Sequence, residues 1–161
     1  MKYLTGTEYT QAKGYMEQAA QIAHQATCGR WKCGSIIVQN NEIIGTGYNS
    51  PPADQPEQRR CDIHKDQYDK KVTDKTCCVH AEQRAIMDAL RNHPDKIIGS
   101  TLYFIRIDQE GNIKHSKKPY CTICSKMALD VGIKEFILRQ EDGIHAYDTG
   151  EYNTLSFNYR P

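Results

Sequence analysis

The chain has 161 residues, a length that fits one domain built around a single hydrophobic core. Its hydrophobic (39%) and charged (25%) fractions are ordinary for a globular protein, and a net charge of +1 argues against the broad basic surface of a protein that binds duplex nucleic acid. No signal peptide or apolar run of ~20 residues is present, so we expect a cytoplasmic protein with no membrane partner.

The first predicted elements are a helix over residues 8–27 and a β-hairpin. The helix carries an apolar stripe at spacings of three and four residues, made of Tyr9, Ala12, Met16, Ala19, Ala23 and Ala26. Its small side chains favour close packing on a sheet over a coiled coil. Two β-branched runs, 35–38 and 42–48, flank a polar turn and are typical of a hairpin. Residues 50–76 contain three prolines and many charges, which predicts a long loop or insertion.

The second half of the chain alternates helices and strands. Helical periodicity begins at Cys78 and stops at His93-Pro94. A mostly apolar strand over 101–107 follows, then a turn and a helix from about Tyr120 to Gly132.

Residues 135–139 read as another strand, and the tail 140–161 as either a further strand or a short helix. Strand–helix–strand segments favour parallel pairing with helices on both sheet faces. We therefore predict an α/β fold of the three-layer α/β/α type, formed by residues 1–161 as one domain.

Seven cysteines, at positions 28, 33, 61, 77, 78, 121 and 124, indicate metal binding. Thiols stay reduced in the cytosol, and an odd number argues against a disulfide framework. Cys121 and Cys124 lie three residues apart, so both sulfurs face one side of the first turn of a helix. The helix N-terminus favours the thiolate that a metal needs.

A metal ligand of another kind, His80, lies at the start of the preceding predicted helix, together with Glu82. Two thiolates and one neutral imidazole suit Zn²⁺ and leave a fourth tetrahedral position open, as in catalytic sites. Zinc lowers the pKa of bound water towards ~7, and Glu82 could carry the released proton. Taken alone, His-Ala-Glu reads as a solvated surface pair and Cys-x-x-Cys as a redox pair or half of a structural zinc site. Their occurrence together favours a catalytic zinc centre.

From about Cys33 to Leu138 the sequence resembles the cytidine and deoxycytidylate deaminase superfamily. That superfamily carries His-x-Glu followed by Pro-Cys-x-x-Cys, here His80-Ala81-Glu82 and Pro119-Tyr120-Cys121-Thr122-Ile123-Cys124. The resemblance implies a cytidine-deaminase-like sandwich with a mixed five-stranded sheet, and a homo-oligomer. It also implies a role for each site residue: zinc ligands His80, Cys121 and Cys124, proton shuttle Glu82, and substrate contacts Asn49 and Ala81. For Asn49 the alternative is a turn residue before Pro51.

The sequence departs from the family pattern in places that bear on substrate choice. One extra residue, Tyr120, separates the proline from the first cysteine; Arg84 stands where deoxycytidylate deaminases commonly have Asn; and residues 50–53 read Ser-Pro-Pro-Ala instead of Thr-Pro-Arg-Gly. The preferred substrate is still a small-molecule cytosine nucleotide such as dCMP, giving dUMP and ammonia. Deamination of another base or nucleoside (cytidine, guanine), tRNA-adenosine-type editing of nucleic acid, and a non-enzymatic zinc-stabilised binding module are the alternatives.

Two further predictions concern the insertion. Its cations and a neighbouring one could form a phosphate clamp, made of Arg59, Arg60, Lys65 and Arg84; the alternative is a solvated charged loop. The Cys-x-x-His spacing of Cys61 and His64 could belong to a second zinc site, with further ligands from Cys28, Cys33, Cys77 or Cys78. Ordinary free thiols are the alternative.

Overall fold

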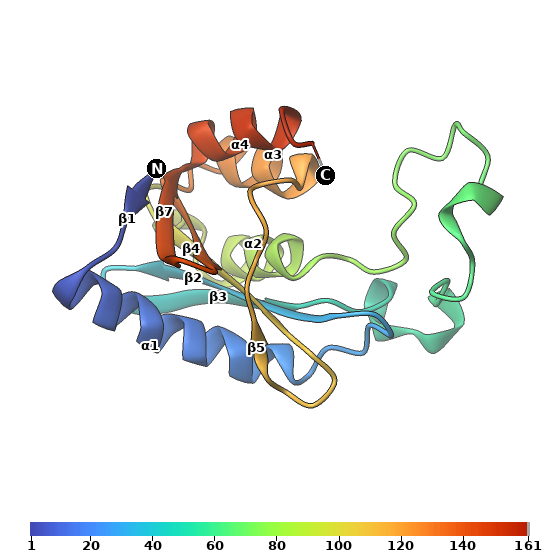
Figure 1. Ribbon diagram of the computed structural model, residues 1–161, viewed down its shortest axis with the longest axis horizontal. Helices are drawn as coiled ribbons and strands as arrows, with labels where there is room; N and C mark the ends of the chain where they lie inside the picture. The colour runs from blue at the N-terminus through green and yellow to red at the C-terminus, as the bar shows by residue number, and fades with distance from the viewer. Residues whose placement is uncertain (161) are drawn as a thin grey trace.

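The computed structural model describes residues 1–160, which form a mixed sheet with helices against both faces (Figure 1). The strands are β1 (Lys2–Tyr3), β2 (Lys32–Gln39), β3 (Glu42–Tyr48), β4 (Thr101–Ile107), β5 (Ile113–Lys114), β6 (Glu135–Gln140) and β7 (Gly143–Asp148). They lie in the order β1-β7-β6-β4-β2-β3, and β5 pairs with the end of β4. Among the described strands, only β4 and β6 pair in parallel. The predicted strand–helix–strand crossover is therefore confirmed between these two strands.

Helix α1 (Gly6–Ala23) covers one face of the sheet, and α2 (Ala81–Asn92), α3 (Thr122–Asp130) and α4 (Thr149–Phe157) cover the other (Figure 1). Alanines of α1, such as Ala19 and Ala23, pack on Ile36 and Ile105 in one core cluster. Ala85 and Ala89 of α2 pack with Phe136 in the second. The predicted three-layer α/β/α architecture is confirmed. No helix within residues 1–160 is long and apolar enough to cross a membrane.

Several predicted boundaries are wrong. The sheet has seven strands and not five, because β1 and β5 are each two residues long, too short to show an alternating pattern. Helix α1 ends at Ala23 and not at residue 27. The helix predicted from Cys78 begins at Ala81, because the Gln83 side chain accepts a hydrogen bond from the His80 backbone N–H and closes the helix start there. The tail holds both alternatives, strand β7 and helix α4.

Glycines on β3 set the distance between the sheet and α2. A Cβ added at Gly47 would overlap the Ala81 carbonyl oxygen and the Ala85 amide nitrogen, and would lie 2.8 Å from the Arg84 Cβ. Only a residue without a side chain allows this approach. Because Ala81 is the first residue of α2, Gly47 fixes the position of the helix end that follows His80 and carries Glu82.

The predicted insertion is an irregular segment that projects from the body in Figure 1, coloured green. Its only helical turns are three short 3₁₀ segments, η1 (Pro52–Asp54), η2 (Pro56–Gln58) and η3 (Lys65–Gln67). A single β-bridge, between Ser50 and Val79, closes the base of the segment. The insertion therefore depends on side-chain contacts for its position.

Candidate active site

Two helix N-termini bring the predicted metal ligands together. His80 is the N-cap residue of α2 and Cys121 that of α3. The His80 Nδ1 lies 3.2 Å from the Cys124 Sγ and 3.4 Å from the Cys121 Sγ, and the three donor atoms lie within 4.8 Å of one another. In a tetrahedral zinc site, bonds of about 2.0–2.3 Å separate ligand atoms by roughly 3.4–3.8 Å. One imidazole and two thiols at these distances fit Zn²⁺.

The hydrogen bonds within this group shift the pKa values of the candidate ligands in opposite senses. Cys124, through its side chain and its backbone N–H, lowers the pKa of the Cys121 thiol to about 4 and so holds it as a thiolate. The Cys121 sulfur in turn raises the pKa of His80 to about 9. Because a metal needs the neutral imidazole, its binding releases the His80 proton.

Glu82 lies beside the ligands on the first turn of α2 and is only 6% exposed. Burial raises the pKa of its carboxyl group above the usual value. A carboxyl group with a raised pKa can both accept and donate a proton near neutral pH. This is the property that a proton shuttle needs.

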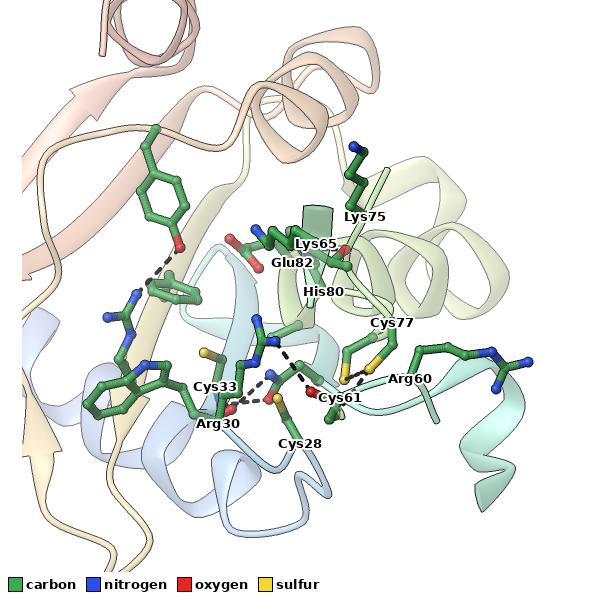
Figure 2. Close-up of a pocket in the computed structure, with 18 of the residues that line it drawn as sticks. Cys28, Arg30, Cys33, Arg60, Cys61, Lys65, Lys75, Cys77, His80 and Glu82 are labelled. Atoms are coloured by element: carbon green, nitrogen blue, oxygen red, sulfur yellow. Dashed lines mark hydrogen bonds between the residues drawn. The ribbon is translucent and has the colours of Figure 1, made fainter. Parts of the chain in front are cut away.

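A cavity of about 270 Å³ opens at these residues, and His80, Ala81 and Glu82 all line it. Figure 2 shows the Glu82 carboxylate turned towards the side chains that line this cavity. Glu82 is the only acidic side chain in the lining, whereas the lining includes five cations, Arg30, Arg60, Lys65, Lys75 and Arg106. Such an imbalance of charge favours an anionic ligand.

The predicted substrate contacts Asn49 and Ala81 both line the cavity. The Asn49 Oδ1 accepts a hydrogen bond from the Cys33 N–H at 2.7 Å, and its Nδ2 donates to the Trp31 carbonyl oxygen at 3.0 Å. Asn49 therefore ties the end of β3 to the start of β2, as well as facing the cavity. A role in substrate binding stays a prediction for both residues.

The predicted phosphate clamp is only partly assembled. Arg60 and Lys65 line the cavity, but Arg59 and Arg84 do not. Arg59 donates a hydrogen bond to the Thr27 carbonyl oxygen at 2.6 Å. Arg84 pairs with Asp54 at 3.3 Å and donates to a backbone carbonyl oxygen at 2.9 Å. Neither the Arg59 nor the Arg84 side chain lines the cavity, so the clamp is not assembled in the predicted combination.

Sequence reasoning missed three of the cations that line the cavity, Arg30, Lys75 and Arg106. Arg106 lies on β4. Its guanidinium lies 5.2 Å from the centroid of the Trp31 ring, and its Nη2 lies 3.4 Å from the Tyr120 Oη. Its Nε is buried and has no hydrogen-bond partner among the described residues. The available signal was a single charged residue within the apolar run 101–107.

The structure brings together some, but not all, of the residues predicted for a second zinc site. Cys33 lies in the cavity lining, and burial raises the pKa of its thiol to about 12. The His64 side chain is 74% exposed and contacts Asp66 at 3.2 Å. Cys28, Cys61 and Cys78 instead lie together. Cys33 and His64 therefore lie outside the group of cysteines that could share a metal ion.

Comparisons with known proteins agree with this geometry. The sequence profile of the cytidine and deoxycytidylate deaminase zinc-binding region matches residues 9–140, and its zinc-binding character confirms Zn²⁺ as the expected metal. Deoxycytidylate deaminase of Mycobacterium phage D29 is 28% identical over 129 residues, which are 76% of this chain and 89% of the phage protein. Deoxycytidylate deaminase of Schizosaccharomyces pombe is 27% identical over 76% of this chain, which spans only 35% of the length of that relative.

Solved structures show the same relationship. The dCMP deaminase of cyanophage S-TIM5, in complex with dCMP and dUMP, has a TM-score of 0.56 and 26% identity, covering 83% of this chain and 82% of its own. Cytidine deaminase from Burkholderia pseudomallei has a TM-score of 0.57, covering 87% of this chain and 94% of its own. At 15% identity, this second likeness shows the fold alone.

Proposed function

The chain belongs to the cytidine and deoxycytidylate deaminase family, and from this premise we propose that it hydrolyses dCMP to dUMP and ammonia. The observation that carries the proposal is the arrangement in the cavity: a buried Glu82 beside three metal-ligating side chains, facing a lining whose other ionic groups are all cations. The first part supports deamination chemistry, and the second supports a substrate with a phosphate group.

The proposed reaction replaces the C4–N bond of cytosine with a C4–O bond. His80, Cys121 and Cys124 would hold Zn²⁺, which when bound supplies the Lewis acidity that lowers the pKa of water towards ~7. Glu82 takes the proton of the attacking water and passes it to the ring nitrogen. It then carries the remaining proton of that water, from the new C4 hydroxyl, to the amine, and the C4–N bond breaks to release ammonia. The burial of Glu82 supports this role, because it allows one carboxyl group to act first as base and then as acid.

Phosphate recognition is assigned to cations that line the cavity and have donors to spare. Arg106 is favoured because its Nε is buried without a partner among the described residues, and because Trp31 and Tyr120 hold its guanidinium in place. The Lys65 side chain comes to the same cavity from the insertion. Each charge-assisted hydrogen bond to phosphate contributes about 1.5–3 kcal/mol, so two correspond to roughly a hundredfold or more in kcat/KM.

The test is a substrate panel with ammonia release as the readout: cytosine, cytidine, deoxycytidine, their monophosphates and guanine. We expect dCMP to exceed deoxycytidine by about a hundredfold in kcat/KM at low salt. Arg106→Gln should remove most of that preference while leaving the rate on deoxycytidine nearly unchanged. Arg91→Gln, on the exposed side of α2, removes the same charge outside the cavity and serves as the control. Equal kcat/KM values for dCMP and deoxycytidine in the wild-type protein would overturn the choice of a nucleotide.

We also propose a homo-oligomer that acts in the cytoplasm. Support for self-association comes from large apolar side chains on the outer helices: Met87 and Leu90 of α2 and Leu129 of α3 are 46%, 43% and 46% exposed. Light scattering of the purified protein tests the state directly. A monomer at micromolar concentration would contradict the homo-oligomer. An oligomer that is unchanged in Met87→Glu would contradict this surface as its interface.

A further inference from the structure

Tyr120 brings a phenolic hydroxyl to the cavity from the position next to a candidate metal ligand. The family signature has proline directly before its first cysteine, whereas here Tyr120 stands between Pro119 and Cys121. The Tyr120 side chain lines the cavity and is 44% exposed. Proline has no polar side-chain atom, so this chain carries a hydrogen-bonding group at a point where the signature itself supplies none.

The contact with Arg106 determines which way the Tyr120 hydroxyl can donate. The Arg106 Nη2 donates to the Tyr120 Oη at 3.4 Å. A guanidinium has donors only, so the phenol oxygen is the acceptor in this pair, and a phenol keeps its own proton at neutral pH. Among residues 1–160, this is the only hydrogen bond that the Tyr120 hydroxyl makes. Its O–H is therefore free to donate to an acceptor on a ligand in the cavity.

The guanidinium beside Tyr120 is held in place and has donors to spare. The Arg106 carbon Cζ lies 5.2 Å from the centroid of the Trp31 ring, and stacking on an aromatic face restricts the orientation of the guanidinium. Its Nε is buried without a partner among the described residues. An O–H and several N–H groups side by side, with no acceptor of their own, suit an anion with several oxygens, such as a phosphate group.

We propose that Tyr120 is a specificity-determining residue, whose O–H donates to the 5′-phosphate of the substrate together with Arg106. This inference rests on the proposed function, because it assigns a contact to the phosphate of dCMP. One hydrogen bond to a charged phosphate corresponds to about tenfold or more in kcat/KM. Since Tyr120 is bonded directly to Cys121, the contact also connects the phosphate end of the cavity with the metal-ligating end.

The test compares ammonia release from dCMP and from deoxycytidine at low salt. Tyr120→Phe removes the hydroxyl and keeps the ring, and should lower the ratio of kcat/KM for dCMP to that for deoxycytidine about tenfold. Tyr159→Phe is the matched control. Its ring centroid lies 5.8 Å from that of Tyr120, but Tyr159 does not line the cavity, so the wild-type ratio should be kept. Zinc content and Tm should match the wild type in both variants.

A double variant separates donation by Tyr120 from positioning of Arg106. If the hydroxyl donates to phosphate, Tyr120→Phe should lower the ratio severalfold again in protein that already carries Arg106→Gln. If Tyr120 only positions the guanidinium, the double variant should equal Arg106→Gln alone, and that result would overturn the proposal. Calorimetry gives a readout without turnover: Tyr120→Phe should weaken the binding of dUMP about tenfold more than the binding of deoxyuridine.

The inference and the proposed function fail on different results. Wild-type protein with equal kcat/KM values for dCMP and deoxycytidine would refute the nucleotide substrate, and the phosphate contact with it. A wild-type preference for dCMP that is unchanged in Tyr120→Phe would refute the contact alone and leave the nucleotide substrate in place.

Discussion

The contact between β3 and α2 gives the sharpest test of how the fold positions the catalytic groups. Gly47→Ala would place a methyl group against the backbone of Ala81 and Ala85, and 2.8 Å from the Arg84 Cβ. Backbone atoms cannot rotate away as a flexible side chain can, so α2 must move as a unit. Overpacking of this kind costs about 1–3 kcal/mol, and more when backbone must shift. We expect the free energy of unfolding to fall by about 3 kcal/mol. For a chain of this size, that change lowers the Tm by about 6–12 °C.

The same displacement should reduce activity out of proportion to stability, because Glu82 and His80 lie at the end of α2 that Gly47 contacts. A misplacement of about 1 Å at the reacting groups can reduce the rate a hundredfold. The control is the identical change at Gly14, in the middle of α1, where an added Cβ meets nothing within 4 Å. Gly14→Ala should raise stability by about 0.5–1 kcal/mol, because alanine is the better helix former, and should keep full activity.

The assay is thermal unfolding of both variants in buffer with equal zinc, followed by kcat at a temperature where each is folded. A Gly47→Ala protein with the wild-type Tm and kcat would show that β3 and α2 can separate freely. The reasoning from close approach would then be wrong. Lower Tm and kcat values in both variants would instead point to an effect of alanine that is unrelated to this contact.

The remaining predictions concern the ionic and metal-ligating side chains. Glu82→Gln should keep zinc and the wild-type Tm but lose at least about 10²–10⁴-fold in kcat; loss of zinc, measured by elemental analysis, would instead make Glu82 a ligand. Cys124→Ser should lose the catalytic zinc and unfold at a lower temperature, because metal binding is coupled to folding; unchanged zinc content would refute the assignment. Arg84→Ala should lower the free energy of unfolding by about 1–2 kcal/mol, because the contacts with Asp54 and the backbone are lost. It should leave the preference for dCMP over deoxycytidine intact; loss of that preference would restore Arg84 to the phosphate site. Lys114 and then Asn112 lower the pKa of Asp108. Its ionised form therefore stabilises the fold above the unfolded pKa of about 3.9, and this contribution is lost as the pH falls. Asp108→Asn should accordingly lower the Tm at pH 7, and the difference from wild type should shrink towards pH 3; a constant difference would contradict the linkage.

Much of the fold could be predicted because its main elements carry strong local patterns. The alanine stripe of α1 and the apolar run of β4 each identify an element without reference to the rest of the chain. The sequence could not show β1 and β5, because two residues form no pattern and both strands exist only through partners far along the chain. The early end of α1 has no proline or glycine to mark it: the next glycine is Gly29, well beyond Ala23.

The metal ligands were predictable for a similar reason. Cys121 and Cys124 are separated by one helical turn, and His80 and Glu82 begin another helix, so each half of the candidate site is a short local motif. The fold has only to bring two helix ends together. The prediction of a zinc-binding member of this deaminase family is confirmed by the matching sequence profile. The roles of the individual residues stay predictions until the variants above are measured.

The side of the cavity that is proposed to select the substrate is assembled differently, and this explains why the predicted phosphate clamp is not the one that the structure forms. Arg106 comes from the middle of the sheet, Lys65 from the insertion and Arg30 from the segment after α1, so no sequence spacing connects them. Arg84 is close to Glu82 in sequence, but successive residues of a helix point in different directions, and its guanidinium turns to Asp54 outside the cavity. Proximity along the chain therefore identifies the groups that are proposed to act on the amine, because one helix turn can hold them. In the proposed function, recognition of the rest of the substrate depends on how the insertion is held against the body, because the insertion brings Arg60, Lys65 and Lys75 to the cavity.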